Sequence, residues 1–337
     1  MIKRLLLLFL SLCLVNILHS QVPDLEREAL IALYNSTDGD NWESNTNWNT
    51  STPVSEWFGI TVVNNHVTKI DLPSNFLKGT LPSEIGNLIM LESLNLWINN
   101  LTGSIPEEIG NLINLTELFL DTNEFTGQIP ASLSNLTLMT NFWLDDNQLS
   151  GDITDFFSSW TNLVYFGIGG GNNFTGSLDL SNNQSLIACW IDNSKISTLN
   201  IKNGNNFNIP NDHFKANNNP NLTCVIVDDV QYSTTNWLNI DESSLFLESL
   251  SECSSTSIDN RNYQAKKIYP NPTKGMIYIR TSEVIREIRI YNSLGQLVQQ
   301  TKDLNCVDLS TLPRGLYYLY AEYGNSNINE TYKIIKE

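Results

Sequence analysis

The sequence predicts two architectures in one chain: a solenoid of stacked short strands, followed by a small all-β sandwich. Four register lines predict the solenoid, because each repeats every 24 residues. They are Asn75, Asn99, Asn123 and Asn147; Gly79, Gly103, Gly127 and Gly151; Leu81, Ile105, Ile129 and Ile153; and Leu88, Leu112, Leu136 and Trp160. Such a period is typical of repeat proteins, in which stacked units bury a shared core. From Lys266 the pattern changes to alternating strands punctuated by turn residues, which is typical of a sandwich of about seven strands.

The repeat reads L-x-x-L-x-L-x-x-N-x-L-x-G-x-I-P-x-x-I-G-x-L, best seen from Leu91 to Leu112. Alternate side chains of a strand lie on opposite faces, so Leu94 and Leu96 are expected to point inward. The Asn side chains are expected to bind backbone groups in a ladder, and Gly103 suits a bend where a side chain would clash. This pattern resembles the leucine-rich repeat, and its G-x-I-P segment is similar to the plant-type subclass.

Residues 1–20 predict a secretory signal peptide. Lys3 and Arg4 precede an apolar run from Leu5 to Leu18, and Ser20 ends the segment. The run is shorter than the roughly 20 apolar residues of a membrane-spanning helix, and no other stretch is long enough. No membrane span is therefore expected in the mature protein.

Residues 21–66 are predicted to cap the N-terminal end of the solenoid. An apolar stripe predicts a helix at Leu25, Leu30, Ile31 and Tyr34. The layout resembles the cap that precedes plant-type leucine-rich repeats, but the flanking Cys pair of that cap is missing. We expect Trp42, Trp48 and Trp57 to cover the open N-terminal end of the core in place of that disulfide.

The solenoid is predicted over residues 67–222, with regular repeats that begin at Val67, Leu91, Leu115 and Met139. A fifth repeat begins at Leu163, and weaker repeats are expected near 186–191 and 196–201. The Asn-rich stretch 205–221 is expected to be irregular. Residues 223–253 are predicted as a C-terminal cap.

The cysteines favour a disulfide rather than a zinc site. Cys224 and Cys253 flank the segment that closes the solenoid, and exported proteins commonly form disulfides, so these two are predicted to pair. Cys189 occupies an inward Leu slot and is expected to behave as a small core residue. Cys306 has no assigned role, and no two cysteines show the close spacing of a zinc site.

Residues 254–264 are polar and predict a linker, and residues 265–337 predict the sandwich. Its strands are expected at 276–279, 285–291, 296–299 and 316–322. Ordered motifs follow one another: I-Y-P-N-P-T at 268–273, I-Y-N-S-L-G at 290–295, L-S-T-L-P-R-G-L-Y at 309–317 and K-I-I-K at 333–336. Together they resemble the type A C-terminal sorting domain of the type IX secretion system. The motif residues are Tyr269, Pro270, Asn271, Pro272, Gly275, Gly295 and Gly315.

That resemblance implies a Gram-negative cell, recognition of the tail by the type IX machinery, and export across the outer membrane. The product is then secreted or attached to the outer-membrane surface. The sorting domain implies nothing about what the exported part binds.

Charge is unevenly distributed along the chain. Residues 21–253 contain 28 Asp and Glu against 6 Lys and Arg, whereas residues 254–337 contain 8 against 11. Nucleic-acid binding needs cations for phosphate contacts, so no nucleic-acid partner is expected. The acidity favours either solubility or a recognition surface.

Three slots of each strand segment should face outward on the concave side of the solenoid. The first slot holds Lys69, Ser93, Glu117, Asn141, Tyr165, Ala188 and Thr198. The middle slot holds Asp71, Asn95, Phe119, Trp143, Gly167, Trp190 and Asn200, and the next holds Pro73, Trp97, Asp121, Asp145, Gly169, Asp192 and Lys202. These slots and their neighbours predict an aromatic track with carboxylates beside it. The predicted ligand-binding residues are Trp97, Glu117, Phe119, Asp121, Trp143, Asp145, Asp146, Tyr165, Trp190 and Asp192.

Exposed aromatic patches usually mark interaction sites, although these rings could also pack on each other or be covered by a neighbouring segment. The favoured function is non-catalytic recognition of a protein or cell-surface partner. The alternatives are glycan binding and, third, a glycan-active enzyme with paired carboxylates. No cofactor and no metal site are expected, with calcium bound by the carboxylates as the one alternative.

Overall fold

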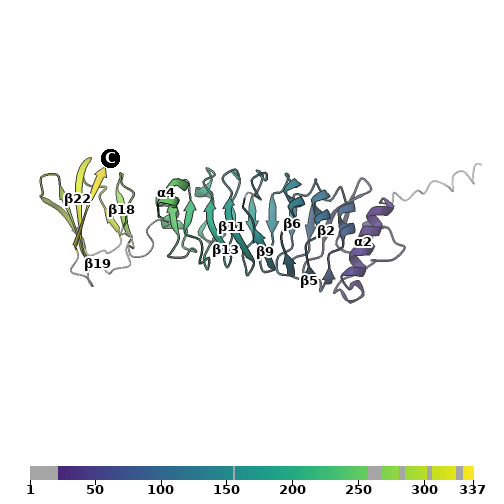
Figure 1. Cartoon of the computed structure of the whole chain (residues 1–337). Coiled ribbons are helices and arrows are strands. Elements are labelled where there is room, and N and C mark those ends of the chain that lie inside the picture. The colour runs from purple at the N-terminus through teal and green to yellow at the C-terminus, as the bar shows by residue number, and fades with distance from the viewer. Residues whose placement is uncertain (1–21, 155, 257–266, 281–284, 302–305, 324–328) are drawn as a thin grey trace, which may run out of the picture. The chain divides into compact units, whose positions relative to one another are not determined.

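The computed structural model describes residues 22–154, 156–256, 267–280, 285–301, 306–323 and 329–337 (Figure 1). The predicted signal peptide and residues 257–264 of the predicted linker lie outside the described residues. The chain divides into two compact units. One runs to Asp228 and includes Asn236–Glu248, and the other comprises Asp229–Thr235 and Ser249–Glu337.

Two sheets run along the first unit (Figure 1). The first sheet has the order β1-β2-β4-β6-β8-β10-β12-β14, with only β1 and β2 antiparallel. Its strands are β1 (Ile60–Val63), β2 (His66–Asp71), β4 (Ser93–Asn95), β6 (Glu117–Phe119), β8 (Asn141–Trp143), β10 (Tyr165–Gly167), β12 (Ala188–Trp190) and β14 (Phe214–Lys215). Every repeat from β2 onward therefore contributes one short strand to this sheet.

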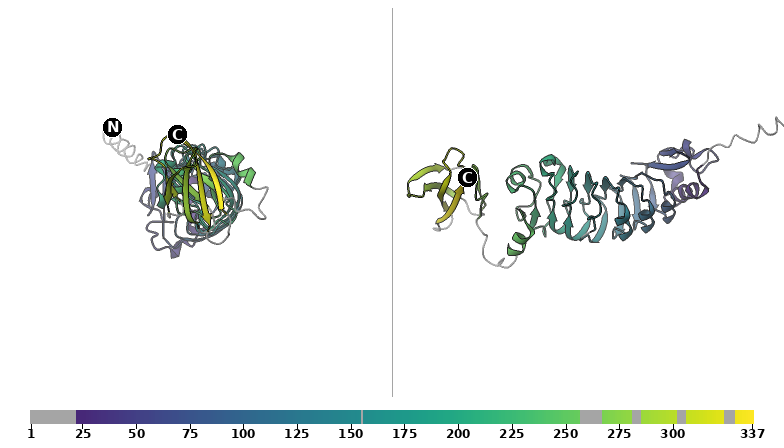
Figure 2. Two further views of the ribbon diagram at one scale, coloured as in Figure 1. Left: turned by 90° about the vertical axis from the view of Figure 1, so that its left-hand side faces the viewer. Right: turned by 90° about the horizontal axis from the view of Figure 1, so that it is seen from above.

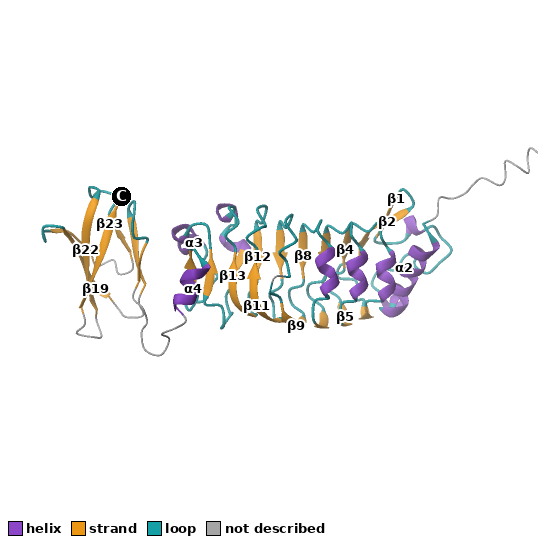
Figure 3. Ribbon diagram, turned by 45° about the horizontal axis from the view of Figure 1, so that its top comes forward, coloured by secondary structure: helices purple, strands orange, loops and turns teal. Residues whose placement is uncertain are grey.

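The second sheet has the order β16-β15-β13-β11-β9-β7-β5-β3. Its strands are β3 (Lys78–Thr80), β5 (Asn100–Gly103), β7 (Glu124–Gly127), β9 (Gln148–Asp152), β11 (Asn173–Asp179), β13 (Lys195–Asn200), β15 (Cys224–Ile226) and β16 (Leu245–Leu247). Short 3-10 helices connect this sheet back to the first in the regular repeats. Figure 3 shows them stacked side by side next to the N-terminal helix: η3 (Ser83–Asn87), η4 (Glu107–Asn111) and η5 (Ala131–Asn135).

The space between these layers is filled by the periodic apolar residues and a ladder of asparagines. Leu94, Leu96 and Leu101 are completely buried, and burial of one such side chain contributes about 1.5–3 kcal/mol. Asn99 donates through Nδ2 to the carbonyls of Leu72 (3.0 Å) and Leu96 (2.9 Å), and its Oδ1 accepts from backbone N–H groups of the preceding repeat. The same contacts recur at Asn123 and Asn147, so the asparagines satisfy backbone groups that the turns would otherwise leave unpaired.

The segment predicted to cap the N-terminal end begins with a helix. Helix α2 (Asp24–Ser36) packs against η3, and two short turns follow it, η1 (Gly39–Asn41) and η2 (Val54–Glu56). Trp42, Trp48 and Trp57 are buried, with successive ring centroids 4.9 Å and 5.1 Å apart. The indole N–H of each donates to a backbone carbonyl, so the three rings close the end of the core without an unpaired polar atom.

The C-terminal part of the solenoid differs from the prediction in one respect. The segment 196–201 is not a further repeat of the first sheet, because it forms β13 in the second sheet. The next strand of the first sheet is β14, which lies in the Asn-rich stretch expected to be irregular. Asn219 continues the asparagine ladder there, donating to Ile191 (2.8 Å) and Ala216 (2.9 Å).

Aromatic side chains also close the far end of the first unit. Trp237 stacks on Phe214 with ring centroids 4.1 Å apart, and its N–H donates to the carbonyl of Ile209. Two further 3-10 turns, η6 (Asn206–Asn208) and η7 (Asn211–His213), shape this region. Cys224 is disulfide-bonded, as is Cys253, whereas Cys189 and Cys306 are free thiols.

The second unit contains a β-sandwich of two sheets within its described residues, with orders β17-β18-β21 and β20-β19-β22-β23 (Figure 2). Its strands are β17 (Lys267–Tyr269), β18 (Met276–Arg280), β19 (Ile285–Asn292), β20 (Leu297–Thr301), β21 (Cys306–Asp308), β22 (Gly315–Tyr323) and β23 (Asn329–Lys336), and two short helices precede them, α3 (Val230–Asn236) and α4 (Leu250–Thr256). Alternate residues such as Ile277, Ile288 and Leu319 fill the core, as the period of two predicts.

The sorting-motif residues lie at the ends of these strands. Asn271 joins the loop after β17 to β23, since its Oδ1 accepts from the N–H of Ile335 (2.8 Å) and its Nδ2 donates to the carbonyl of Lys333 (2.6 Å). Gly295 has φ +77° in the tight turn between β19 and β20, a conformation that favours glycine. The motif thus reflects the turns and closures that the sandwich requires.

Candidate binding face

The outer face of the first sheet presents the slots that the sequence analysis placed there. Register pairs align Asn95, Phe119, Trp143, Gly167, Trp190 and Lys215 across successive strands. A second row aligns Ser93, Glu117, Asn141, Tyr165 and Ala188. The predicted positions Asn200 and Lys202 are wrong, because Asn200 ends a strand of the second sheet and Lys202 follows it. Lys215 on β14 takes the place that Asn200 was expected to occupy.

The aromatic side chains of this face are not part of the leucine core. Trp97 is 40% exposed, and Phe119, Trp143, Tyr165 and Trp190 are half-buried, whereas the inward residues that precede four of them, Leu96, Leu118, Phe142 and Cys189, are completely buried. Phe119 and Trp143 lie on paired strands. The aromatic side chains therefore lie on the outward face of the strands, as the predicted aromatic track requires.

Trp143 and Trp190 contact each other across β10, with ring centroids 4.8 Å apart and planes at 81°. Gly167 lies between them, and a Cβ atom at this position would collide with the ring of Trp143. The repeat pattern alone permits the aromatic side chains to pack on one another. They do so in this pair, and both rings remain partly exposed.

Two exposed apolar side chains, Phe76 and Ile98, lie in the turns that follow the first two repeat strands, and the repeat pattern did not predict their exposure. Phe76 is 61% exposed and Ile98 is 39% exposed, and both have positive φ angles, +60° and +53°. A branched residue such as Ile98 rarely adopts this backbone conformation. Comparison of the repeats could have predicted the exposure of Ile98. The positions equivalent to Ile98 in later repeats hold Thr122, Asp146 and Gly170, which are polar or lack a side chain.

Two of the predicted carboxylates make different contacts. Glu117 lies in a polar ladder, accepting from the Ser93 hydroxyl (2.8 Å) and from Nδ2 of Asn141 (3.0 Å). Asp145 is only 8% exposed; its Oδ1 accepts from the N–H of Gly169 (2.9 Å), and its Oδ2 is buried without a hydrogen-bond partner. Glu117 thus organises the face, whereas Asp145 retains unused hydrogen-bonding capacity.

Burial perturbs the acids at the C-terminal ends of these strands. It raises the pKa of Asp145 to about 8, with the charges of Asp121 and Asp192 adding to the effect while the Gly169 hydrogen bond opposes it. Burial also raises the pKa of Asp121 to about 6, with a contribution from Asp146. The pKa of Asp146 is raised by burial and by Asp192, and Lys215 opposes this shift. These four carboxylates therefore influence one another electrostatically.

Lys215 is a functional candidate that the sequence analysis missed. Its Nζ lies 3.4 Å from the ring centroid of Trp190, a cation–π contact. The segment Phe214-x-Ala216-x-x-Asn219 could have predicted this strand, because it has the spacing of Leu94-x-Leu96-x-x-Asn99. Phe214 and Ala216 replace the two inward leucines, and Asn219 takes the place of the ladder asparagine. This side chain is one of the six cations in residues 21–253.

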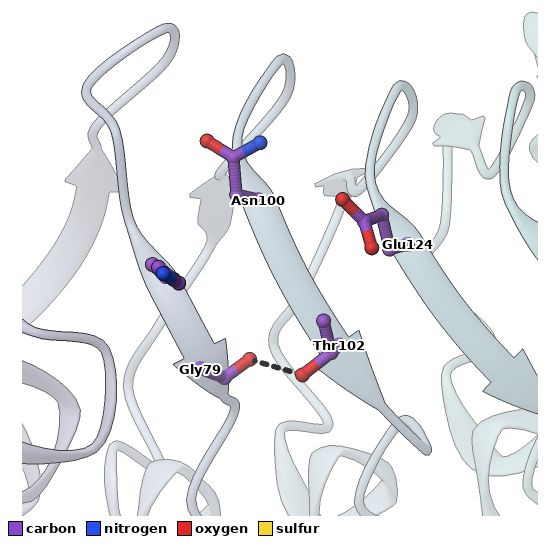
Figure 4. Close-up of a pocket in the computed structure, with 5 residues that line it drawn as sticks. Gly79, Asn100, Thr102 and Glu124 are labelled. Atoms are coloured by element: carbon purple, nitrogen blue, oxygen red, sulfur yellow. Dashed lines mark hydrogen bonds between the residues drawn. The ribbon is translucent and has the colours of Figure 1, made fainter.

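Other sites have less chemistry to offer. A pocket of about 420 Å³ on the second sheet is lined by Lys78, Gly79, Asn100, Thr102 and Glu124 (Figure 4). Thr102 donates from its hydroxyl to the carbonyl of Gly79 (3.1 Å), and no aromatic side chain lines the pocket. Among the described residues, no three His, Cys, Asp or Glu side chains form a group that could hold a metal ion. None of the helices in the described part of the chain combines the length and apolar character needed to cross a membrane.

Comparisons with known proteins match both units. A family model described as Leucine Rich Repeat matches residues 90–112 and 114–136, and one described as Secretion system C-terminal sorting domain matches residues 267–337.

Solved structures with a similar fold include the leucine-rich-repeat ectodomain of the Arabidopsis thaliana receptor kinase GASSHO1/SCHENGEN3 in complex with CASPARIAN STRIP INTEGRITY FACTOR 2. Its TM-score is 0.50 at 22% identity, over 60% of this chain and 27% of that chain. The ectodomain of the receptor kinase SOBIR1 from the same plant has a TM-score of 0.45 at 25% identity, over 53% of this chain and 96% of that chain.

The family matches agree with the two parallel sheets, the asparagine ladder and the closing sandwich. A sorting domain of this kind indicates export. The chain therefore contains leucine-rich repeats, matched over residues 90–112 and 114–136, and a secretion-system C-terminal sorting domain at residues 267–337.

Proposed function

We propose that the chain is an exported, non-catalytic binding protein that recognises a protein partner through the outer face of the first sheet. The observation that carries this proposal is the row of solvent-facing aromatic side chains on successive repeats, from Trp97 to Trp190. Trp and Tyr are frequent anchors of protein interfaces, and a contiguous exposed apolar patch usually marks an interaction site. Ile98, which follows Trp97 directly, adds a further exposed apolar side chain.

Charge supports a basic partner. The solenoid and its caps carry 28 acidic against 6 basic residues, so a partner with exposed Lys or Arg would be attracted over a distance comparable to the Debye length. Association should therefore slow as salt is added, while the aromatic contacts retain most of the bound lifetime.

The face is the open side of a sheet, and this favours binding over catalysis. Enzymes gain much of their rate from closed sites that exclude water. The neighbouring carboxylates Asp121, Asp145 and Asp192 come from different repeats and line no enclosed cavity in the described residues. We therefore assign them to recognition, and the sandwich to delivery of the first unit to the surface or the medium of a Gram-negative cell.

The test is a capture experiment with the full chain immobilised and surface proteins of neighbouring cells as the sample. The variant Trp97→Ala/Trp143→Ala removes two anchors from the face. The matched control Lys78→Ala/Glu124→Ala changes two side chains on the second sheet. We expect the aromatic variant to lose at least tenfold of the specific partner, and the control to retain it.

Equal recovery of every partner by wild type and by the aromatic variant would remove the proposed face. Thermal unfolding of both variants checks that each is folded, because Trp143 also packs on Trp190. Retention on polysaccharide arrays with no protein partner would contradict the assignment to a protein ligand.

A further inference from the structure

A cluster of acidic and aromatic side chains covers the glycines of the repeat that contains β10. This repeat places Gly167, Gly169 and Gly170 where the others place side chains. In each case the position of a missing Cβ is taken by a neighbouring repeat: the carboxylates of Asp145 and Asp146 on one side, and Asp192 on the other. Three carboxylates from two flanking repeats therefore converge over one glycine-rich strand.

One carboxylate of this cluster has an unsatisfied oxygen atom. Asp145, almost completely buried, keeps Oδ2 without a hydrogen-bond partner, although a buried carboxylate oxygen left unpaired is costly. Asp121 and Asp192 add negative charge to the same place. The positive charge of Lys215 interacts with Asp146 and opposes the rise in its pKa.

The contact of Lys215 with Trp190 indicates which kind of ligand group this cluster would bind. The Lys215 ammonium lies over the ring of Trp190, so one aromatic wall already binds a protonated nitrogen of the chain itself. A second aromatic wall, Trp143, stands at 81° to the first. Aromatic faces beside carboxylates suit an ammonium or, better, a planar guanidinium, which can stack and donate at once.

We propose that this cluster, formed by Trp143, Asp145, Asp146, Trp190 and Asp192, binds a Lys or Arg side chain of the protein partner. The inference rests on the proposed function and specifies the partner's chemistry at one point of the face. Oδ2 of Asp145 and the ring of Trp143 both lie over Gly167, so movement of either side chain would expose Oδ2 to the cation. Bound there, the cation supplies the hydrogen bond that Oδ2 lacks.

The binding step is coupled to a proton. Asp145 must be ionised to pair with the cation, and burial raises its pKa to about 8, so the cation displaces a proton at neutral pH. The charged or titratable groups that interact with Asp145 are Asp121, Asp192 and the buried thiol of Cys189, and Asp146 and Lys215 belong to the same cluster because they interact with each other and Asp192 acts on Asp146. Affinity should therefore rise with pH up to about 8.5, where arginine is still fully charged.

Calorimetric titration of the full chain with hexa-arginine, hexa-lysine and uncharged hexa-citrulline tests the proposal. We expect hexa-arginine to bind at least tenfold more tightly than hexa-citrulline, and more tightly at pH 8.5 than at pH 6. Asp145→Asn should reduce that affinity about tenfold, whereas Glu124→Gln, which removes the same charge from the second sheet, should change it less than twofold. Hexa-lysine binding as tightly as hexa-arginine would identify the ligand group as an ammonium.

Lys215→Gln gives a result that misfolding cannot imitate. Removing the internal ammonium frees the Trp190 ring, so hexa-arginine should bind several-fold more tightly, and more so than to Lys78→Gln on the second sheet. Equal losses in Asp145→Asn and Glu124→Gln, or equal binding of hexa-citrulline, would overturn the proposal. If Asp145→Asn captures the partner normally while the Trp97/Trp143 variant does not, the cation site is wrong and the binding face stands.

Discussion

The two sheets of the solenoid are made by the same repeats, yet their outer faces differ in chemistry. The first sheet exposes Trp, Phe, Tyr and Asp side chains, whereas the second exposes Lys78, Thr102, Glu124 and glycines (Figure 4). Both sheets have the same parallel stacking and share one core. The period therefore determines the fold for both faces equally, and only the outward slots distinguish a candidate binding surface from a plain one.

The largest effect should come from the asparagine ladder that both sheets share. Asn123 is buried, donates to the carbonyls of Leu96 and Leu120, and accepts from the N–H of Leu101. Asn123→Ala leaves these groups unpaired and should cost about 3 kcal/mol or more. We expect the melting temperature to fall by about 5 °C or more in calorimetry.

Asn100→Ala is the matched control, because this asparagine is exposed on the second sheet. Its stability should change by less than about 0.5 kcal/mol. Similar losses in the two variants would mean that burial does not distinguish the two asparagines.

An effect of intermediate size is expected in the pH dependence of the melting temperature, to which Asp145 on the first sheet should contribute and Asp152 on the second should not. Asp145 has a folded pKa raised well above the unfolded value of 3.8, so its stabilising contribution is complete below that value and is lost as pH rises toward about 8. The melting temperature of wild type should therefore fall between pH 5 and pH 9. Asp145→Asn removes this titration and should reduce the fall by about 5 °C.

Asp152 on the second sheet is the control. Hydrogen bonds from Thr154 lower its pKa, so it stays ionised over the whole interval, and Asp152→Asn should leave the slope unchanged. A slope in Asp145→Asn as steep as in wild type would contradict the assignment of the titration to Asp145.

The smallest effect concerns stability at the exposed end of the face. Trp97 is 40% exposed, so Trp97→Ala should change the free energy of unfolding by less than about 1 kcal/mol in urea titration, close to the change for Thr126→Ala on the second sheet. A much larger loss would show that Trp97 supports the fold and was not retained for binding alone.

Most of the architecture could be predicted because it follows from periods. Leu94, Leu96 and Asn99 recur with their equivalents every 24 residues, and burial of one set requires exposure of the alternating set. The prediction went wrong where the spacing lengthened to 25 residues, between Cys189 and Phe214, and aromatic or small residues replaced leucine. The second sheet's β13 was then mistaken for a strand of the first.

The finer features of the site could not be predicted from the pattern. The contact between Trp143 and Trp190 depends on side-chain rotamers and on the space above Gly167. The unpartnered oxygen of Asp145 depends on which of two oxygens meets the N–H of Gly169. Such relations arise between side chains of different repeats, and a one-dimensional pattern does not contain their geometry.

The buried aspartate has a consequence for the molecule as an electrolyte. The formal net charge of −17 counts every carboxylate as ionised, but Asp145 is mostly neutral at pH 7 and Asp121 still holds a fraction of a proton. In an electric field the protein should migrate as a less acidic particle than its composition suggests. Its electrophoretic mobility should increase as the medium becomes alkaline. A bound cation should reduce that increase, because it displaces the proton of Asp145 already at neutral pH.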